Sequence, residues 1–436
     1  MNLQPLPGFR DFFPAELALR SHIFATWRSV AVRYGFEEYD GPPLEPLELY
    51  TAKSGDEIVG QLYNFVDKGE RPVALRPEMT PTLARMVAAR ANGLRKPIRW
   101  FAIPQLFRYE RQQRGRLREH FQLNCDLIGE AGALGDAELI ALAVDVLRAF
   151  GFTSDDVRVR LSDRRALAAL LTGGGLPQDA LAPAFLAIDK MERMSRAELA
   201  FQLNAAGLTG GQIERVFQVA ALRGRAEVFG ALAEVPEGEQ VAATFEALLD
   251  ALDAMGLGRF VEVDLTIVRG LAYYTGTVFE LFDAGRSLRA ICGGGRYDNL
   301  LHSLGGVDLP AAGFGMGDVV LGELLKDRGL VPAPRHALDT WVAAVTPDDQ
   351  VHVLALAHEL RDAGFRVGYS FNASAIGKQL KDADARGSRT AIIIGPDDRA
   401  RGEVQLKDLT AKTQQSVPRD AVAAALASTQ PVATHG

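Results

Sequence analysis

The chain has 436 residues, 47% hydrophobic and 24% charged, so it is long enough for two or three globular domains, and it lacks the apolar run of about 18 residues that spans a membrane. Its formal net charge of −7 argues against a protein that coats nucleic acid, so a nucleic acid would have to be bound by a local basic patch. The two cysteines lack CxxC spacing and the seven histidines lack ligand spacing, so no metal site is predicted. The cysteine pattern and the lack of a leader segment predict a cytoplasmic protein.

The N-terminal segment predicts a long helix followed by an edge strand. Residues 7–11 (PGFRD) indicate a tight turn, and apolar residues at helical spacing predict an amphipathic helix over residues 14–34. Pro42 and Pro43 confine the next strand to the edge or boundary of a sheet. The simplest function of the helix is packing, although a helix that ends in an edge strand is also a common dimerisation device.

Two short strands are predicted at residues 62–66 and 73–76, and the second runs directly into RPEMTPTLAR. Thr80 or Thr82 is expected to cap the helix that follows. Glu78 lies at the corner between strand and helix, where a side chain can face a cleft. From the pattern alone, capping is its simpler function.

The stretch FRYERQQRGRLREHFQLNCDLIG, residues 107–129, predicts an antiparallel strand pair with one apolar and one polar face. Gln122, Asn124 and Asp126 alternate with apolar residues, which places their hydrogen-bonding side chains on one face. The connecting loop is too long for a tight hairpin turn, and its arginines suggest a polyanionic ligand. A solvated, charged hairpin explains the pattern equally well. The loop arginines are Arg111, Arg114, Arg116 and Arg118.

Beyond the hairpin, the pattern changes from mixed to helical. Residues 136–150 predict a helix rich in Ala and Leu, and residues 157–163 predict another strand. Residues 165–256 have helical periodicity and few aromatic residues, which predicts a helical insertion between strands of one sheet domain. No pattern within this insertion indicates its function.

Strands resume at residue 261 with an unusual arginine and two glycine-rich runs. By alternation, Arg269 continues an apolar strand face that begins at Val261, so its charge must reach solvent or meet an anion. The runs at 291–300 and 313–321 do not match a GxGxxG that opens a helix, so a dinucleotide site is not predicted. Consecutive glycines inside strands instead suggest a ligand that lies flat against bare backbone.

The C-terminal part predicts a separate domain. Pro332, Pro334 and Arg335 mark a linker, after which strands and helices alternate, as in a small α/β domain with a mostly parallel sheet. Its basic residues are expected to form a solvated face. The predicted strands are residues 341–345, 365–370 and 390–395, and the predicted helices are residues 351–363, 377–386 and 419–427.

Taken in order, these segments resemble the histidyl-tRNA synthetases, a family of class II aminoacyl-tRNA synthetases. Residues 7–42 resemble motif 1 of the class, which implies a homodimer, and residues 107–129 resemble motif 2. The run VRGLAYYTGTVFE, residues 268–280, resembles the histidine-specific signature. The resemblance covers nearly the whole chain, so it rests on several ordered motifs and not on one.

The resemblance implies a fold with three parts. The first is an α+β catalytic domain of the class II type, residues 1–164 and 257–330, whose mixed sheet is mainly antiparallel. A helical insertion, residues 165–256, interrupts it. A C-terminal α/β anticodon-binding domain, residues 338–430, completes the chain.

The resemblance also implies a histidine–tRNA ligase, which uses ATP and Mg²⁺ to make histidyl-adenylate and pyrophosphate and then transfers histidine to the terminal adenosine of tRNA(His). Arg108 would hold the ATP α-phosphate, Glu110 the adenine end and Arg116 the γ-phosphate side. Arg269 would contact the α-phosphate and the histidine carboxylate, so Arg108 and Arg269 are the expected catalytic residues. The expected histidine pocket comprises Glu78, Thr80, Gln122, Asp126, Arg269, Tyr273 and Tyr274, and the expected contacts to the acceptor end of the tRNA are Arg111, Gln112, Gln113 and Arg114.

Three places depart from the family's pattern. Asp126 stands where the family usually has Glu, and Ala272 stands where it usually has Asp. Val319 and Val320 occupy the Glu-Arg positions of motif 3, whose arginine stacks on adenine with a contribution of about 1–2 kcal/mol. We therefore expect weaker ATP binding unless another group substitutes for this arginine.

Two other functions fit parts of the chain. Non-catalytic paralogues act as histidine-sensing regulatory subunits of ATP phosphoribosyltransferase, but they tend to lose motif residues and to lack the anticodon-binding domain. Here Arg108, Arg116 and Arg269 are present and the C-terminal domain is complete, which favours the synthetase. A nucleotide-binding oxidoreductase would need the dinucleotide fingerprint, which does not occur.

Overall fold

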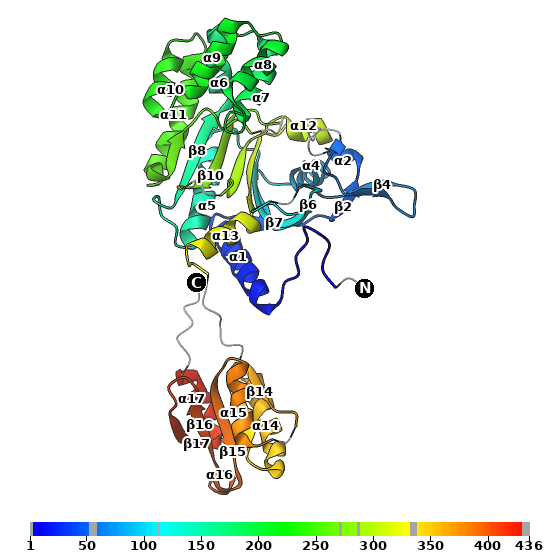
Figure 1. Cartoon of the computed structure of the whole chain (residues 1–436), viewed down its shortest axis with the longest axis vertical. Helices are drawn as coiled ribbons and strands as arrows, with labels where there is room; N and C mark the ends of the chain where they lie inside the picture. Colours follow the sequence, from blue (N-terminus) through cyan, green and yellow to red (C-terminus); the bar gives the residue numbers. More distant parts are fainter. Residues whose placement is uncertain are drawn as a thin grey trace. The chain divides into compact units, whose positions relative to one another are not determined.

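The computed structural model describes residues 3–51, 59–111, 113–269, 273–285, 288–331, 338–372 and 374–429. The chain divides into two compact units, Met1–Pro332 and Ala333–Gly436, each with its own hydrophobic core (Figure 1). Three sequence features lie outside the described residues: the linker at 332–335, Gln112 and Ala272.

The larger unit is built on a nine-stranded sheet in the order β1-β5-β7-β12-β11-β10-β8-β9, with β6 paired to the start of β7. The outer pairs β1·β5 and β8·β9 are parallel, and the other described pairs of this sheet are antiparallel. The predicted mixed, mainly antiparallel sheet is therefore confirmed. The strands are β1 (Glu37–Glu38), β5 (Ile98–Ala102), β6 (Gln105–Phe107), β7 (Glu119–Ile128), β8 (Val157–Asp163), β9 (Val261–Val263), β10 (Thr277–Asp283), β11 (Cys292–Arg296) and β12 (Ala311–Gly317).

One face of this sheet is apolar and is covered by helices. Leu123, Cys125 and Leu127 of β7 lie on that face and are buried, as the alternation predicts. Trp27 packs in the same core and is fully buried. Burial of each large apolar side chain stabilises the fold by about 1.5–3 kcal/mol. The covering helices are α1 (Pro14–Arg33), α5 (Ala133–Ala149) and α13 (Asp318–Asp327).

A small antiparallel sheet, with the strand order β2-β4-β3, places the strand that follows Pro42 and Pro43 at its edge, as predicted. The helix after the second predicted strand begins at Thr80, but its N-cap is Met79, which makes no side-chain cap bond. The expected capping by Thr80 or Thr82 is therefore wrong, and Thr82 is buried. These elements are β2 (Leu44–Pro46), α2 (Glu48–Thr51), β3 (Asn64–Val66), β4 (Pro72–Leu75), α4 (Thr80–Ala88) and α12 (Leu300–Gly305).

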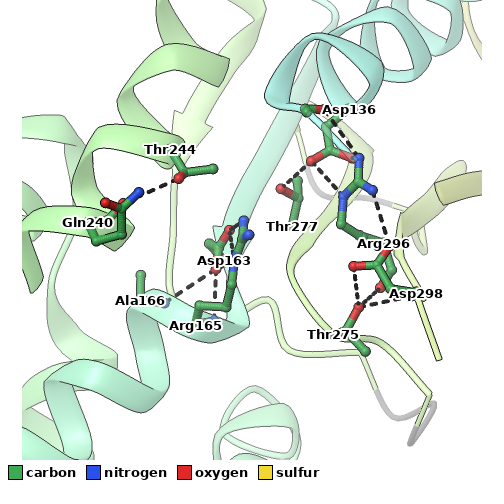
Figure 2. Close-up of polar contacts among 11 residues, drawn as sticks. Asp136, Asp163, Arg165, Ala166, Gln240, Thr244, Thr275, Thr277, Arg296 and Asp298 are labelled. Carbon is green, nitrogen blue, oxygen red and sulfur yellow. Dashed lines mark hydrogen bonds and ion pairs between the residues drawn. The ribbon is translucent and has the colours of Figure 1, made fainter. Parts of the chain in front are cut away.

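A bundle of helices is inserted between β8 and β9 and lies at one end of the sheet (Figure 1). Its first helix is capped by Asp163, whose carboxylate accepts hydrogen bonds from the backbone N–H groups of Arg165 at 2.7 Å and Ala166 at 3.3 Å (Figure 2). The helices are α6 (Arg164–Gly173), α7 (Leu181–Asp189), α8 (Arg196–Ala205), α9 (Gly210–Ala221), α10 (Gly224–Ala233) and α11 (Gly238–Ala254).

The segment before Arg269 differs from the prediction. Strand β9 ends at Val263, and Asp264 begins a turn in which its carboxylate accepts hydrogen bonds from the hydroxyl and the N–H of Thr266. Arg269 has φ = 57°, in the left-handed region. The expected alternation along one strand face from Val261 to Arg269 is therefore wrong, because this hydrogen-bonded turn ends the strand.

A buried ion-pair network fixes the end of β11 (Figure 2). Arg296, 2% exposed, donates hydrogen bonds to Asp136 of α5 at 2.7 Å and to Asp298 at 3.1 Å. Thr277 of β10 donates to the other oxygen of Asp136 at 2.9 Å. Because unpairing a buried charge costs about 3–5 kcal/mol, this network holds β10, β11 and α5 in one arrangement.

The smaller unit is an α/β domain with a five-stranded sheet in the order β14-β13-β15-β16-β17. The three predicted strands, β13, β14 and β15, are parallel to one another, as expected. Strands β16 and β17, which were not predicted, extend the sheet through antiparallel pairs, so the sheet as a whole is mixed. The elements are β13 (Leu338–Ala344), α14 (Gln350–Asp362), β14 (Val367–Tyr369), α15 (Ile376–Ala385), β15 (Ser388–Ile394), α16 (Pro396–Ala400), β16 (Glu403–Asp408), β17 (Gln414–Pro418) and α17 (Val422–Thr429).

Candidate active site

Two cavities open on the polar face of the main sheet. The larger has a volume of about 610 Å³ and is lined by residues of β7, β8, β10, β11 and β12, of the loop before β7 and of the segment between α7 and α8. The smaller has a volume of about 70 Å³ and lies over β7, β11 and β12, beside the start of α4. The two cavities meet, because they share five lining residues: Arg108, Gln122, Arg269, Gly293 and Gly315.

Arg108 and Arg269 reach this junction from two different segments. Arg108 follows β6, and its Nε donates to the backbone carbonyl of Pro77 at 2.9 Å. Arg269 precedes β10, and its Nη1 donates to Glu280 at 2.7 Å. The Nε of Arg269 is buried without a hydrogen-bond partner among the described residues. An unpaired buried donor costs about 1–3 kcal/mol, so an anionic ligand that accepts from this Nε would offset the cost.

Glycines form the floor of the smaller cavity. Gly293 pairs with Gly315 across β11 and β12, and Gly313 pairs with Asp126 across β12 and β7. A Cβ atom at Gly293 would overlap the guanidinium of Arg269, and one at Gly315 would lie 2.6 Å from Cδ of Gln122. These glycines therefore leave room for the side chains of Arg269 and Gln122 above the strands, and a ligand that lies flat against bare backbone stays a prediction.

The seven residues expected to bind histidine all line the smaller cavity. The hydroxyl of Tyr273 donates to Glu78 at 3.3 Å, and the ring of Tyr274 lies 5.0 Å from that of Tyr273. Tyr297, which the sequence had not indicated, donates a hydrogen bond to Asp126. Burial raises the pKa of Asp126 to about 7, although the hydrogen bond from Tyr297 opposes this shift.

The larger cavity carries an excess of positive charge. Its described lining contains six arginines and three glutamates, and each glutamate pairs with an arginine: Glu110 with Arg116, Glu192 with Arg160 and Glu280 with Arg269. Three arginines therefore exceed the carboxylates, which suits a polyanion. The cationic residues are Arg108, Arg116, Arg160, Arg193, Arg269 and Arg289.

The residues of the loop between β6 and β7 lie in different places relative to the two cavities. Arg116 lines the larger cavity, whereas Arg111 is exposed and lines neither cavity. Arg114 forms an ion pair with Asp327 of α13 at 2.8 Å. Gln113 accepts a hydrogen bond from Arg289 at 2.7 Å. Of the candidate contacts to the acceptor end that the structure describes, all three lie outside the two cavities.

Several lining residues were missed by the sequence analysis. His120 alternates along β7 with the expected residues Gln122 and Asp126, and this alternation could have found it. Glu280 lies in β10, a strand in which no site residue was expected. Burial, and then the charges of Arg108 and Arg10, lower the pKa of His120 to about 3, so its imidazole is neutral at physiological pH. Glu192 and Arg193 arrive from the helical insertion, and no local pattern marks them.

The apolar part of the larger cavity includes the positions at which the chain departs from motif 3. Val319 and Val320, at the start of α13, both line the cavity. A Cβ atom at Gly115 would lie 3.3 Å from Cγ2 of Val320, so the valine packs under the arginine-rich loop. This wall offers apolar contact and no charge at residue 320.

The polar face of a mainly antiparallel sheet carries two cavities that are joined at a pair of arginines, and this arrangement fits the fold of the class II aminoacyl-tRNA synthetases. A family model described as histidyl-tRNA synthetase matches residues 8–317, and a model described as anticodon binding domain matches residues 341–429. The chain belongs to the histidyl-tRNA synthetase family.

Individual relatives are similar to this chain over nearly its whole length. The histidine–tRNA ligase of Opitutus terrae is 48% identical over 427 residues, which cover 97% of this chain and 98% of that protein. The chloroplastic/mitochondrial histidine–tRNA ligase of Arabidopsis thaliana is 39% identical, with 96% of this chain and 85% of that protein covered. The crystal structure of histidyl-tRNA synthetase from Nostoc sp. PCC 7120 superposes with a TM-score of 0.83 at 26% identity and covers 99% of this chain and 100% of that chain.

Proposed function

We propose that this chain is a histidine–tRNA ligase, which activates histidine with ATP and transfers it to tRNA(His). The observation that carries the proposal is the junction of the two cavities at Arg108 and Arg269. A nucleotide in the larger cavity and an amino acid in the smaller one would bring their reacting groups together there. Membership of the family and the names of its full-length relatives support the same activity.

In the first step, an oxygen of the histidine carboxylate attacks the α-phosphorus of ATP. The bond from this phosphorus to the bridging oxygen of the β-phosphate breaks, and pyrophosphate leaves. Negative charge builds on the non-bridging oxygens of the α-phosphate. Arg108 and Arg269 present guanidinium groups from two sides of the junction, and their charge stabilises this developing charge more than it stabilises the ground state.

The smaller cavity would select the imidazole side chain. Glu78 and Asp126 supply acceptors at the cavity wall, and Gln122 supplies both a donor and acceptors. A site that hydrogen-bonds both ring nitrogens rejects amino acids that leave these groups unpaired. In the second step, a hydroxyl of the terminal adenosine of tRNA attacks the carbonyl carbon of the adenylate, and AMP leaves.

Mg²⁺ belongs to the proposal because ATP is used as its magnesium complex. The described residues contain no group of three or more possible metal ligands, and the three glutamates of the larger cavity already pair with arginines. Mg²⁺ would therefore be held mainly by phosphate oxygens. When bound, it would neutralise phosphate charge.

The remaining parts of the proposal concern assembly and location. We propose a cytoplasmic homodimer in which residues 1–164 and 257–330 catalyse, residues 165–256 form the helical insertion and residues 338–430 bind the anticodon region. In the part of the chain that the structure describes, no helix is long and apolar enough to cross a bilayer. Arg111, Gln112, Gln113 and Arg114 remain the proposed contacts to the acceptor end of the tRNA.

The test is histidine-dependent exchange of radioactive pyrophosphate into ATP by the purified protein, together with charging of tRNA(His). Exchange with charging is the expected result, with histidine strongly preferred over other amino acids. Histidine binding without exchange or charging would contradict the ligase and would favour the regulatory paralogue. The two arginines at the cavity junction and the presence of a C-terminal unit that matches an anticodon binding domain speak against that paralogue.

A further inference from the structure

Arg289 lies where two distant segments meet at the larger cavity. It belongs to the connection between β10 and β11 and lines the cavity beside Leu288 and Ala290. Its Nη2 donates to the side-chain oxygen of Gln113 at 2.7 Å, in the loop between β6 and β7. This bond fixes the guanidinium beside the arginine-rich loop, although the side chain is exposed and packs in no core.

The surroundings of Arg289 are positively charged. Burial, and then the charges of Arg116 and Arg193, lower the pKa of Arg289, while the carboxylate of Glu110 raises it. Glu110 is already paired with Arg116, so it cannot neutralise all three guanidinium groups. Like charges held close together repel one another, and a multiply charged anion between them would offset this repulsion.

The three arginines come from three separate segments of the chain. Arg116 comes from the loop before β7, Arg193 from the segment between α7 and α8, and Arg289 from the connection before β11. A junction of this kind is not a solvated face of one element, because no single helix or strand places the charges together. Val320, on the wall beneath the same loop, contributes no charge.

We propose that Arg289 is an ATP-binding residue of this chain, which holds the β- and γ-phosphates together with Arg116 and Arg193. The inference rests on the proposed function, because it assigns ATP to the larger cavity. Arg108 and Arg269 hold the α-phosphate at the cavity junction, and Arg289 holds the part of ATP that leaves as pyrophosphate. Gln113 positions Arg289 for this contact through the 2.7 Å hydrogen bond.

The experiment compares Arg289→Gln and Arg289→Lys with the wild-type protein. Direct titration with ATP and with AMP measures binding without reference to catalysis. We expect Arg289→Gln to weaken ATP binding about tenfold, since a charge-assisted contact is lost, and to change AMP binding less than about twofold. The lysine variant keeps the charge and should recover part of the ATP affinity. Arg95→Gln, at an exposed arginine that lines neither cavity, is the matched control and should leave both affinities unchanged.

Pyrophosphate exchange by the same proteins separates this inference from the proposed function. In Arg289→Gln, KM for ATP should rise about tenfold while KM for histidine stays unchanged, and Gln113→Ala should show a smaller rise in KM for ATP. Equal ATP affinities of wild type and Arg289→Gln would overturn the inference even if wild type exchanges normally. Equal weakening of ATP and AMP would also overturn it, because the contact would then not be to the β- and γ-phosphates. Absence of exchange in the wild type would instead contradict the proposed function, while the titrations would still test Arg289.

Discussion

At the scale of single residues, Arg269 has features that a structural surface arginine does not need. Its backbone lies in the left-handed region, which costs a non-glycine residue about 1–3 kcal/mol, and its Nε is buried without a partner among the described residues. The sequence analysis required its charge to reach solvent or to meet an anion, and in the structure the guanidinium pairs with Glu280. The reason was wrong, because a turn and not a strand places it.

Replacing Arg269 by Ala should impair adenylate formation much more than histidine binding. Charge on the α-phosphate develops mainly in the transition state, so we expect the exchange rate to fall about 10²–10³-fold and histidine affinity to fall less than about tenfold. Exchange kinetics and calorimetric titration with histidine measure the two quantities. Arg269→Lys keeps the charge but lacks the planar guanidinium, so its exchange rate should lie between those of the wild type and Arg269→Ala. Equal losses in rate and affinity would contradict the role proposed for Arg269.

Replacing Asp126 by Asn should stabilise the ligand-free protein at alkaline pH. The pKa of Asp126 is raised to about 7 by burial, so the folded protein holds this proton more tightly than the unfolded chain, whose Asp pKa is near 4. Stability from this group is present below pH 4 and is lost as the pH rises through 7. We expect the variant to gain on the order of 1–3 kcal/mol at pH 8, less at pH 5 and little below pH 4, measured by urea unfolding. A gain that did not depend on pH would contradict this origin.

At the scale of elements, the glycines of β11 and β12 have different functions on the two faces of the sheet. Gly293 and Gly315 face the cavities, whereas a Cβ atom at Gly294 would lie 2.6 Å from Cβ of Phe314 in the apolar core. Alternation along the strand therefore assigns neighbouring glycines to different tasks. One glycine leaves room for a functional arginine, and the next permits close packing.

Substitution of Gly293 should mainly reduce activity, whereas substitution of its neighbour Gly294 should mainly reduce stability. Gly293→Ala would displace the guanidinium of Arg269, so we expect exchange activity to fall at least about 10²-fold with a small loss of stability. Gly294→Ala meets the backbone of Gly313 and the side chain of Phe314, so we expect about 1–3 kcal/mol of destabilisation. Thermal unfolding and exchange assays on both variants give the comparison. Similar effects of the two substitutions on both measurements would contradict the assignment by face.

The sequence predicted a helix or strand correctly where the spacing of its apolar residues is regular. The period of two in β7 and the helical period of α1 identified both elements and their buried faces. The cap of α4 and the turn after β9 were mispredicted, because proline and local hydrogen bonds outweigh the pattern there. Arg193 and Arg289 could not be placed at all, since their position depends on contacts between segments far apart in the chain.

At the scale of the whole molecule, the chain consists of two units with separate cores. Val342, Leu356 and Ile392 belong to the core of the smaller unit, and the cavities lie entirely within the larger one. In the function proposed above, amino-acid activation belongs to the larger unit and recognition of the tRNA to the smaller one. The sequence showed this division through the change of pattern after residue 335.

Residues 338–436 expressed alone should therefore fold cooperatively, and residues 1–332 alone should retain histidine-dependent exchange. We expect the larger fragment to keep exchange within about tenfold of the full chain and to lose at least about 10²-fold in tRNA charging, because recognition of the tRNA is lost. Circular dichroism, exchange and charging assays measure these outcomes. Loss of exchange in a folded larger fragment would show that the smaller unit is needed for activation.

The glycine floor of the smaller cavity also limits how its specificity can evolve. A pocket lined below by side chains can be deepened by trimming one of them, but Gly293, Gly313 and Gly315 have nothing left to trim. A side chain at any of these glycines would displace Arg269, Asp126 or Gln122, so with histidine in this cavity, as proposed, a change of preference toward larger substrates must come from the walls. Substitutions at wall residues such as Tyr273 and Gln122 are therefore the route to a pocket that accepts bulkier histidine analogues. The glycine floor keeps the depth of the pocket constant in all such variants.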